Sequence, residues 1–155
     1  MLYVTCYNDS MTIFIGADHR GFELKNKLID YLHEKDIRIE DMGNFSLDPQ
    51  DDYSDYANKV AMAVLQHPEA HLGIVICGSG VGVCIAANRH KGISCALGFD
   101  ETQVAHAREN DHINVLSLPS DYVDFEKAKT LVERFLAAKP KLEEKYLRRV
   151  RKLNT

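Results

Sequence analysis

The chain has 155 residues, of which 45% are hydrophobic and 27% are charged, and its formal net charge at pH 7 is −4. This composition is typical of a single water-soluble globular domain. The negative net charge provides none of the basic field on which nucleic-acid binding depends. No apolar run reaches the roughly 20 residues that a membrane-spanning helix needs, so we expect neither a nucleic acid nor a membrane as partner.

The first ten residues, MLYVTCYNDS, have neither the basic region nor the sustained apolar region of a secretory signal. We expect residues 1–10 to be an extension that precedes one domain formed by residues 11–155. The four cysteines contain no CxxC pair, and three of them lie in apolar segments, which is typical of reduced thiols. The sequence therefore predicts a cytoplasmic protein.

Apolar and amphipathic segments alternate along the first half of the domain. Residues 12–18 (TIFIGAD) predict a short buried strand, because β-branched and aromatic residues run up to Gly-Ala-Asp. Residues 22–36 place apolar side chains at helical spacing, and residues 37–43 alternate in polarity like a second strand. The Asn, Ser, Pro and Asp content of residues 44–52 predicts a loop, and helical spacing returns over residues 53–66.

The second half of the domain continues this alternation. Its predicted elements are a strand at 72–77, a helix at 81–90, a strand at 93–99, a helix at 101–110, a strand at 113–118, and helices at 125–139 and 141–153. Five short strands separated by helices predict an α/β fold, a three-layer, doubly wound (Rossmann-like) domain with a five-stranded parallel sheet. The last helix would form a C-terminal extension.

A glycine-rich segment directly follows the third predicted strand. Cys77 ends the strand, and Gly78-Ser79-Gly80-Val81-Gly82 lead into the next helix. Because glycine has no Cβ atom, backbone N–H groups can approach an anion beside the helix N-terminus, a position that also favours a thiolate. A dinucleotide fingerprint would need glycine in place of Val83, and no P-loop Gly-Lys-Ser/Thr is present. The alternative for Cys77 is a buried structural thiol.

A second polar segment, GADHRG (16–21), follows the first predicted strand. Asp18 can accept a proton from a sugar hydroxyl, and His19 is a natural proton carrier near neutral pH. The alternative for Asp18 is that it caps the following helix. Ligands of doubly wound folds bind at the carboxyl ends of the strands, where both the Asp-His pair and the glycine-rich segment lie.

Three segments occur in order: GADHRGFELK, DDYSDYA and IVICGSGVGVCIAANRHKGI. Together they resemble the RpiB/LacA/LacB family of sugar-phosphate isomerases, from about Met11 to about Leu153. The resemblance implies an aldose–ketose isomerase without metal or cofactor, most often acting on ribose 5-phosphate and ribulose 5-phosphate. It also implies a homodimer or tetramer whose site lies at the subunit interface.

The resemblance further implies the roles of individual residues. The catalytic base falls on Cys77, a hydroxyl that assists proton transfer on Ser79, and the amides that stabilise the enediolate on residues 78–82. Asp18 falls on the acidic member of the Asp-His pair that contacts the sugar.

The expected substrate-binding residues outside the glycine-rich loop come from several segments. His19 completes the Asp-His pair, and Tyr53 resembles an aromatic residue that lines the pocket. Lys145 and Arg149 fall on the basic pair that clamps the phosphate, although lysine offers a point charge where arginine, with its bidentate fork, is common.

The chain departs from the family pattern at two further places. Asn110, followed by Asp111, stands where the family carries a histidine that helps to open the sugar ring, and asparagine cannot shuttle a proton. We still expect both residues to contact substrate. After the fifth strand, a Gly-Ser-Arg turn whose arginine helps bind phosphate is replaced by residues 119–121 (Pro-Ser-Asp). Two alternatives therefore stay open: an isomerase of a tetrose or hexose phosphate, and a non-catalytic sugar-phosphate-binding homologue.

Overall fold

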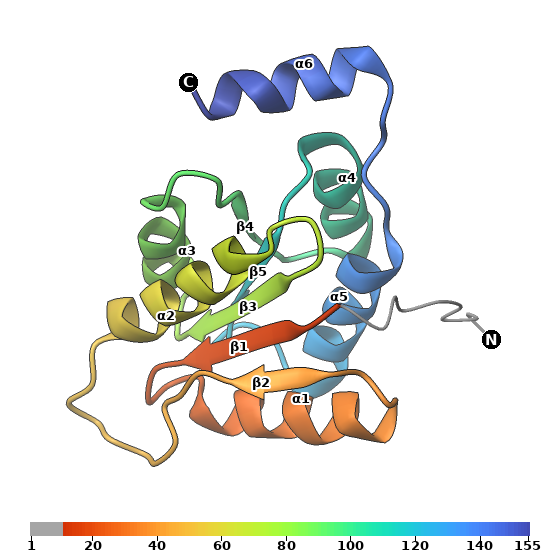
Figure 1. Cartoon of the computed structure of the whole chain (residues 1–155). Coiled ribbons are helices and arrows are strands. Elements are labelled where there is room, and N and C mark those ends of the chain that lie inside the picture. Colours follow the sequence, from red (N-terminus) through yellow and green to blue (C-terminus); the bar gives the residue numbers. More distant parts are fainter. Residues whose placement is uncertain (1–10) are drawn as a thin grey trace.

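Short β-branched runs and amphipathic segments form a parallel sheet with helices on both faces in the computed structural model, which describes residues 11–155 (Figure 1). The strands are β1 (Ile13–Ala17), β2 (Ile39–Asp41), β3 (Leu72–Cys77), β4 (Cys95–Leu97) and β5 (Val115–Pro119). The helices are α1 (Phe22–Glu34), α2 (Tyr53–Gln66), α3 (Val81–Asn88), α4 (Glu101–Asp111), α5 (Phe125–Ala137) and α6 (Glu144–Leu153). The predicted α/β fold is confirmed; the extension expected at residues 1–10 lies outside the described residues.

The five strands lie in the order β2-β1-β3-β5-β4, and every neighbouring pair is parallel. Ala17 of β1 pairs with Ile76 of β3, and Cys77 pairs with Pro119 of β5. The ends of these three strands therefore meet at one edge of the sheet. From β1 the chain continues to β2 on one side, and from β3 it continues toward the other, so the switch point at which such folds bind ligands lies between β1 and β3.

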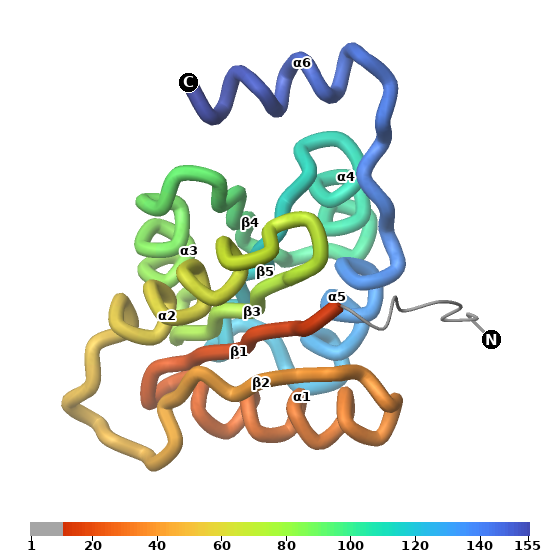
Figure 2. The backbone as a smooth tube through the Cα atoms, viewed as in Figure 1, coloured from red at the N-terminus to blue at the C-terminus, as the bar shows by residue number. Residues whose placement is uncertain are grey.

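Two apolar layers hold the helices against the sheet. Val60 of α2 and Val83 of α3 are buried on one face, while Leu28 of α1 and Leu131 and Phe135 of α5 are buried on the other. β3 lies between both layers and is buried along its whole length, which explains its uninterrupted apolar sequence. Figure 2 shows that the loop between β2 and α2 extends beyond the ends of the strands.

Helix α6 stands apart from this core (Figure 1). Its main contact is with α4, and none of its residues from Glu144 to Leu153 is buried. It begins three residues later than predicted, because Lys141 donates its backbone N–H to Glu109 O (2.8 Å) and accepts from the His112 ring through its own carbonyl (2.8 Å). Residues 153–155 reach a hollow lined by residues 88–93. Helix α6 therefore lies at the edge where the strands begin.

Along residues 11–155, no helix has the length and apolar character needed to cross a membrane.

Candidate active site

Cys77 ends β3 at the edge where the chain enters the glycine-rich loop. Cys77 is only 5% exposed. Its carbonyl accepts hydrogen bonds from the backbone N–H (3.0 Å) and the hydroxyl (3.1 Å) of Ser120. These bonds tie the end of β3 to the turn after β5. The position of the thiol is thus fixed beside the first turn of α3.

Gly80 shapes the loop between Cys77 and α3. Its φ of +71° lies in the left-handed region, which a side chain disfavours. A Cβ atom at this position would lie 2.6 Å from Leu97 Cδ1 and 3.0 Å from the Pro119 nitrogen. Glycine therefore lets the chain pass from strand to helix in a few residues, and this places the N–H groups of the first turn of α3, which have no carbonyl partner within the helix, next to the thiol. Ser79 is exposed and accepts from the Val81 N–H (3.2 Å).

Asp18 lies beside this loop at the end of β1, and its backbone N–H donates to Ile76 O (3.2 Å). One carboxylate oxygen, Oδ1, accepts from the N–H groups of Arg20 (3.0 Å) and Gly21 (3.1 Å). Burial raises the pKa of Asp18, and the two backbone hydrogen bonds only partly oppose it. The capping role considered from the sequence is thus present, while the second oxygen has no hydrogen-bond partner within residues 11–155.

His19 is held by Asp51, a residue that the sequence analysis did not identify. The ring Nδ1 lies 2.7 Å from Asp51 Oδ1, and the His19 backbone N–H donates to the same oxygen (3.1 Å). The other oxygen accepts from Asn44 Nδ2 (2.6 Å). The Asp51 side chain is only 3% exposed; burial raises its pKa, but the hydrogen bonds from His19 and Asn44 outweigh burial and lower it. An ionised Asp51 therefore fixes the orientation of the imidazole.

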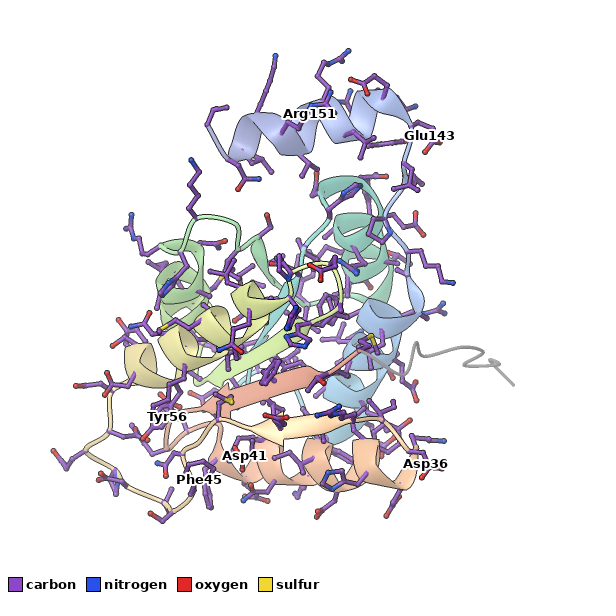
Figure 3. All side chains as sticks on the ribbon, in the orientation of Figure 1. Asp36, Asp41, Phe45, Tyr56, Glu143 and Arg151 are labelled. Carbon is purple, nitrogen blue, oxygen red and sulfur yellow. The ribbon has the colours of Figure 1, made fainter. Side chains whose placement is uncertain are left out.

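The turn that carries Asn44 is itself fixed by a buried lysine. Lys25 Nζ donates to both carboxylate oxygens of Asp41 (2.7 Å each) and to Asn44 O (2.8 Å). Figure 3 labels Asp41 on β2, above α1, the helix from which Lys25 comes. A continuous polar network thus runs from α1 through Asn44 and Asp51 to His19.

Two further contacts complete this edge. Tyr53 lies against the loop, because a Cβ atom at Gly82 would be 2.8 Å from its ring atoms. An ion pair between Arg20 and Asp121 lies over Gly78, and the sequence analysis did not assign a role to Arg20. The structure therefore brings together Cys77, the glycine loop, Asp18, His19 and Tyr53, as expected for one site.

One group with metal-ligand spacing occurs within residues 11–155. Ligand atoms of Asp18, His19 and Asp51 lie within 4.8 Å of one another. In the structure the His19 ring nitrogen and an Asp51 oxygen bind each other, and an Asp18 oxygen binds two backbone N–H groups. These side chains are therefore already engaged in shaping the site.

The remaining expected site residues lie at the opposite edge of the sheet. Asn110 and Asp111 end α4, and Asn110 Oδ1 accepts from Lys141 Nζ (3.0 Å). Lys145 and Arg149 belong to α6; Figure 3 labels Glu143, directly before this helix, and Arg151, within it. The six residues of β3 separate the two edges by about 20 Å at roughly 3.3 Å per residue. A single chain therefore does not bring these four residues to Cys77.

A model of the Ribose/Galactose Isomerase family matches residues 13–153. The chain belongs to this family. A protein of Mycoplasma pneumoniae named probable ribose-5-phosphate isomerase B is 46% identical to it over 126 residues, which are 81% of this chain and 82% of that protein. Ribose-5-phosphate isomerase B of Escherichia coli is 38% identical over 126 residues, or 81% and 83% of the two chains. The resemblance expected from the sequence motifs is confirmed.

Solved structures of family members have the same fold. Ribose-5-phosphate isomerase B from Mycoplasma genitalium, solved with bound ribulose-5-phosphate, superimposes with a TM-score of 0.90 at 40% identity and covers 94% of this chain and 95% of its own. The enzyme from Thermotoga maritima gives 0.87 at 40% identity, covering 93% and 97%.

Proposed function

We propose that this chain is an aldose–ketose isomerase that interconverts ribose 5-phosphate and ribulose 5-phosphate in the cytoplasm. The observation that carries the proposal is the convergence of a buried thiol, a glycine loop at a helix N-terminus and an Asp-His pair at the switch point of the sheet. The ribulose-5-phosphate bound to the related M. genitalium enzyme supports this choice of substrate.

The proton transfer is assigned to Cys77. Its thiolate removes the proton from C2 of the aldose and returns it to C1, which turns the aldose into the ketose through an enediolate. The N–H groups of residues 78–82 stabilise the negative charge on the enediolate oxygen, and Ser79 assists proton transfer to and from the sugar oxygens. The rigid αL turn at Gly80 keeps these donors aimed at one point.

Asp18 and His19 bind the sugar beside the thiol. The raised pKa of Asp18 suits a carboxylate that accepts a hydroxyl proton and releases it again. Asp51 holds Nδ1 of His19 (2.7 Å), which leaves Nε2 for the substrate. Tyr53 closes the pocket next to Gly82.

The site is proposed to be shared between two chains of a homodimer or of a tetramer. Three apolar side chains next to the loop, Tyr53, Val81 and Ile85, are 46–52% exposed in the single chain, which favours their burial against a partner. A second chain would supply the phosphate clamp of Lys145 and Arg149, with Asn110 and Asp111, to the thiol of the first. The wide separation of the two groups within one chain supports this arrangement.

Interconversion of ribose 5-phosphate and ribulose 5-phosphate by the purified protein tests the reaction. We expect turnover in the wild type and a loss of about 100- to 10,000-fold in Cys77→Ala, the range for removal of a positioned acid–base group. Cys95→Ala, a change of a different half-buried thiol, is the matched control. Equal turnover by wild type and Cys77→Ala would contradict the role of Cys77.

Mixing of inactive chains tests the shared site. Cys77→Ala and Arg149→Ala chains that are unfolded together and refolded should form mixed dimers in half of all cases, each with one intact site, which restores about a quarter of the wild-type activity. If each site lay within one chain, the mixture would stay as inactive as its two components.

A non-catalytic role in binding sugar phosphates is the second candidate. It is favoured by Asn110, which stands where a proton-transferring histidine is expected and whose Oδ1 accepts a hydrogen bond from Lys141 Nζ (3.0 Å). Absence of turnover with ribose, tetrose and hexose phosphates alike, together with their binding, would favour it. Turnover of a tetrose or hexose phosphate in preference to ribose 5-phosphate would keep the isomerase and change its substrate. Rapid alkylation of Cys77 that substrate prevents would support the enzyme.

A further inference from the structure

Arg20 holds a guanidinium directly above the glycine loop, in the same chain as Cys77. A Cβ atom at Gly78 would lie 2.6 Å from Arg20 Nε and 2.8 Å from Asp121 Oδ2. The Arg20 Nε donates to Asp121 Oδ2 (3.0 Å), and Nη2 contacts the same oxygen. The cation thus lies over Gly78, the residue that directly follows Cys77 in the chain.

The backbone around this ion pair is fixed at both ends. The Arg20 N–H donates to Asp18 Oδ1 (3.0 Å), and its carbonyl accepts from the Ser120 hydroxyl (3.0 Å). The Asp121 N–H donates to Gly78 O (3.0 Å). Arg20 therefore belongs to the same rigid edge as the proposed catalytic residues, which is the arrangement that pre-organises a binding group.

The guanidinium of Arg20 has N–H donors available to bind a ligand. Of its five N–H bonds, two point to Asp121, which leaves three without an acceptor within residues 11–155. The Arg20 side chain is 56% exposed, whereas Cys77 is 5% exposed. The cation therefore lies at the mouth of the site and the thiol at its deep end. An extended sugar phosphate with its reacting carbons at the thiol would point its other end toward Arg20.

The ion pair between Arg20 and Asp121 adds little to the stability of the fold, because exposed ion pairs contribute little to the free energy of folding. Charge complementarity offers a better reason for this pair: a phosphate monoester carries close to two negative charges at neutral pH, and arginine binds phosphate oxygens through parallel N–H donors. In this chain, Asp121 stands where the family resemblance implies a phosphate-binding arginine, and Arg20 reaches across to that very position from the turn after β1.

We propose that Arg20 binds the phosphate group of the substrate in the same chain as Cys77, with Asp121 as the residue that orients its guanidinium. This inference rests on the proposed function, since it takes the substrate to be a sugar phosphate. The phosphate would then lie between Arg20 of one chain and the clamp of Lys145 and Arg149 of the other.

Steady-state kinetics and phosphate binding test this role. In Arg20→Gln we expect the KM for ribose 5-phosphate to rise by about tenfold to a hundredfold, the range for loss of a charge-assisted hydrogen bond, with kcat changed less than about threefold. The dissociation constant of inorganic phosphate, measured by calorimetry, should rise in parallel. Arg38→Gln is the matched control, because Arg38 is an exposed, ion-paired arginine next to the start of β2, at the other edge.

The exchange variant Arg20→Asp/Asp121→Arg separates recognition from folding. It restores an arginine above Gly78 with the same partner, so most of the phosphate affinity should return. Unchanged phosphate binding in Arg20→Gln, an equal loss in Arg38→Gln, or a loss confined to kcat would overturn the proposal. Failure of the proposed function would look different: wild-type protein would then show no turnover, while the phosphate measurements would still decide the role of Arg20.

Discussion

Replacement of Asp51 by asparagine removes one negative charge from the network that holds His19. The amide oxygen can keep the two bonds from His19 that now reach Oδ1 (2.7 and 3.1 Å), but the NH₂ group would face Asn44 Nδ2, which now donates to Oδ2 (2.6 Å). Asn44 is only 4% exposed, so its N–H is left without a partner. A buried unsatisfied donor costs about 1–3 kcal/mol, and we expect Asp51→Asn to lower the free energy of unfolding by about 2 kcal/mol at pH 7.

Acid should remove this difference. The pKa of Asp51 is lowered in the folded chain, so its contribution is complete above the unfolded pKa of about 4 and disappears as the pH falls through the lower folded value. Urea unfolding at a series of pH values from 7 down to about 2, at one chain concentration, measures both effects. Asp30→Asn, on the exposed side of α1, is the control. A variant as stable as the wild type at pH 7, or a gap that persists in acid, would refute this account of Asp51.

Two further changes address the loop and a neighbouring thiol. Gly80→Ala should destabilise the chain by about 1–2 kcal/mol for the left-handed conformation alone, and the approach to Leu97 and Pro119 should displace the loop and reduce kcat; normal stability and turnover would contradict the strain. Cys84 receives a hydrogen bond from the Cys95 thiol that, against burial, lowers its pKa to about 7. Its alkylation by iodoacetamide should therefore rise through neutral pH, and in Cys95→Ala this rise should move to higher pH. The same profile in both proteins would show that Cys95 is not the cause.

The fold could be predicted because each element carries its own periodicity, whereas the boundaries depend on distant partners. The strand expected at 93–99 is shortened to Cys95–Leu97, since the Ser94 N–H donates to the side chain of Asn114 (2.9 Å) in place of a strand neighbour. The late start of α6 has a similar cause in the contacts of Lys141 with α4. Hydrogen bonds between segments 20 or more residues apart leave no periodic signal in the sequence.

The candidate site could be predicted only where a motif is continuous in sequence. Cys77 and the glycine loop, and likewise Asp18 and His19, are neighbours along the chain and at the ends of adjacent strands. Asp51 lies 32 residues from His19, and Asp121 lies 101 residues from Arg20, so no local pattern joins them. The sequence did contain one indication of Arg20. Asp121 stands where the family resemblance implies a phosphate-binding arginine, so another segment of the chain is expected to supply the missing positive charge.

The direction of the strands has a consequence for how activity depends on assembly. Helix α4 runs back from the carboxyl edge of the sheet, so its last residues, Asn110 and Asp111, return to the edge where β5 begins. Helix α6 follows from there and stays at that edge, where residues 153–155 reach the end of α3. No rotation of side chains spans the roughly 20 Å to Cys77. If the proposed clamp is used, an isolated chain binds phosphate through Arg20 alone, and specific activity must fall on dilution in step with dissociation of the dimer.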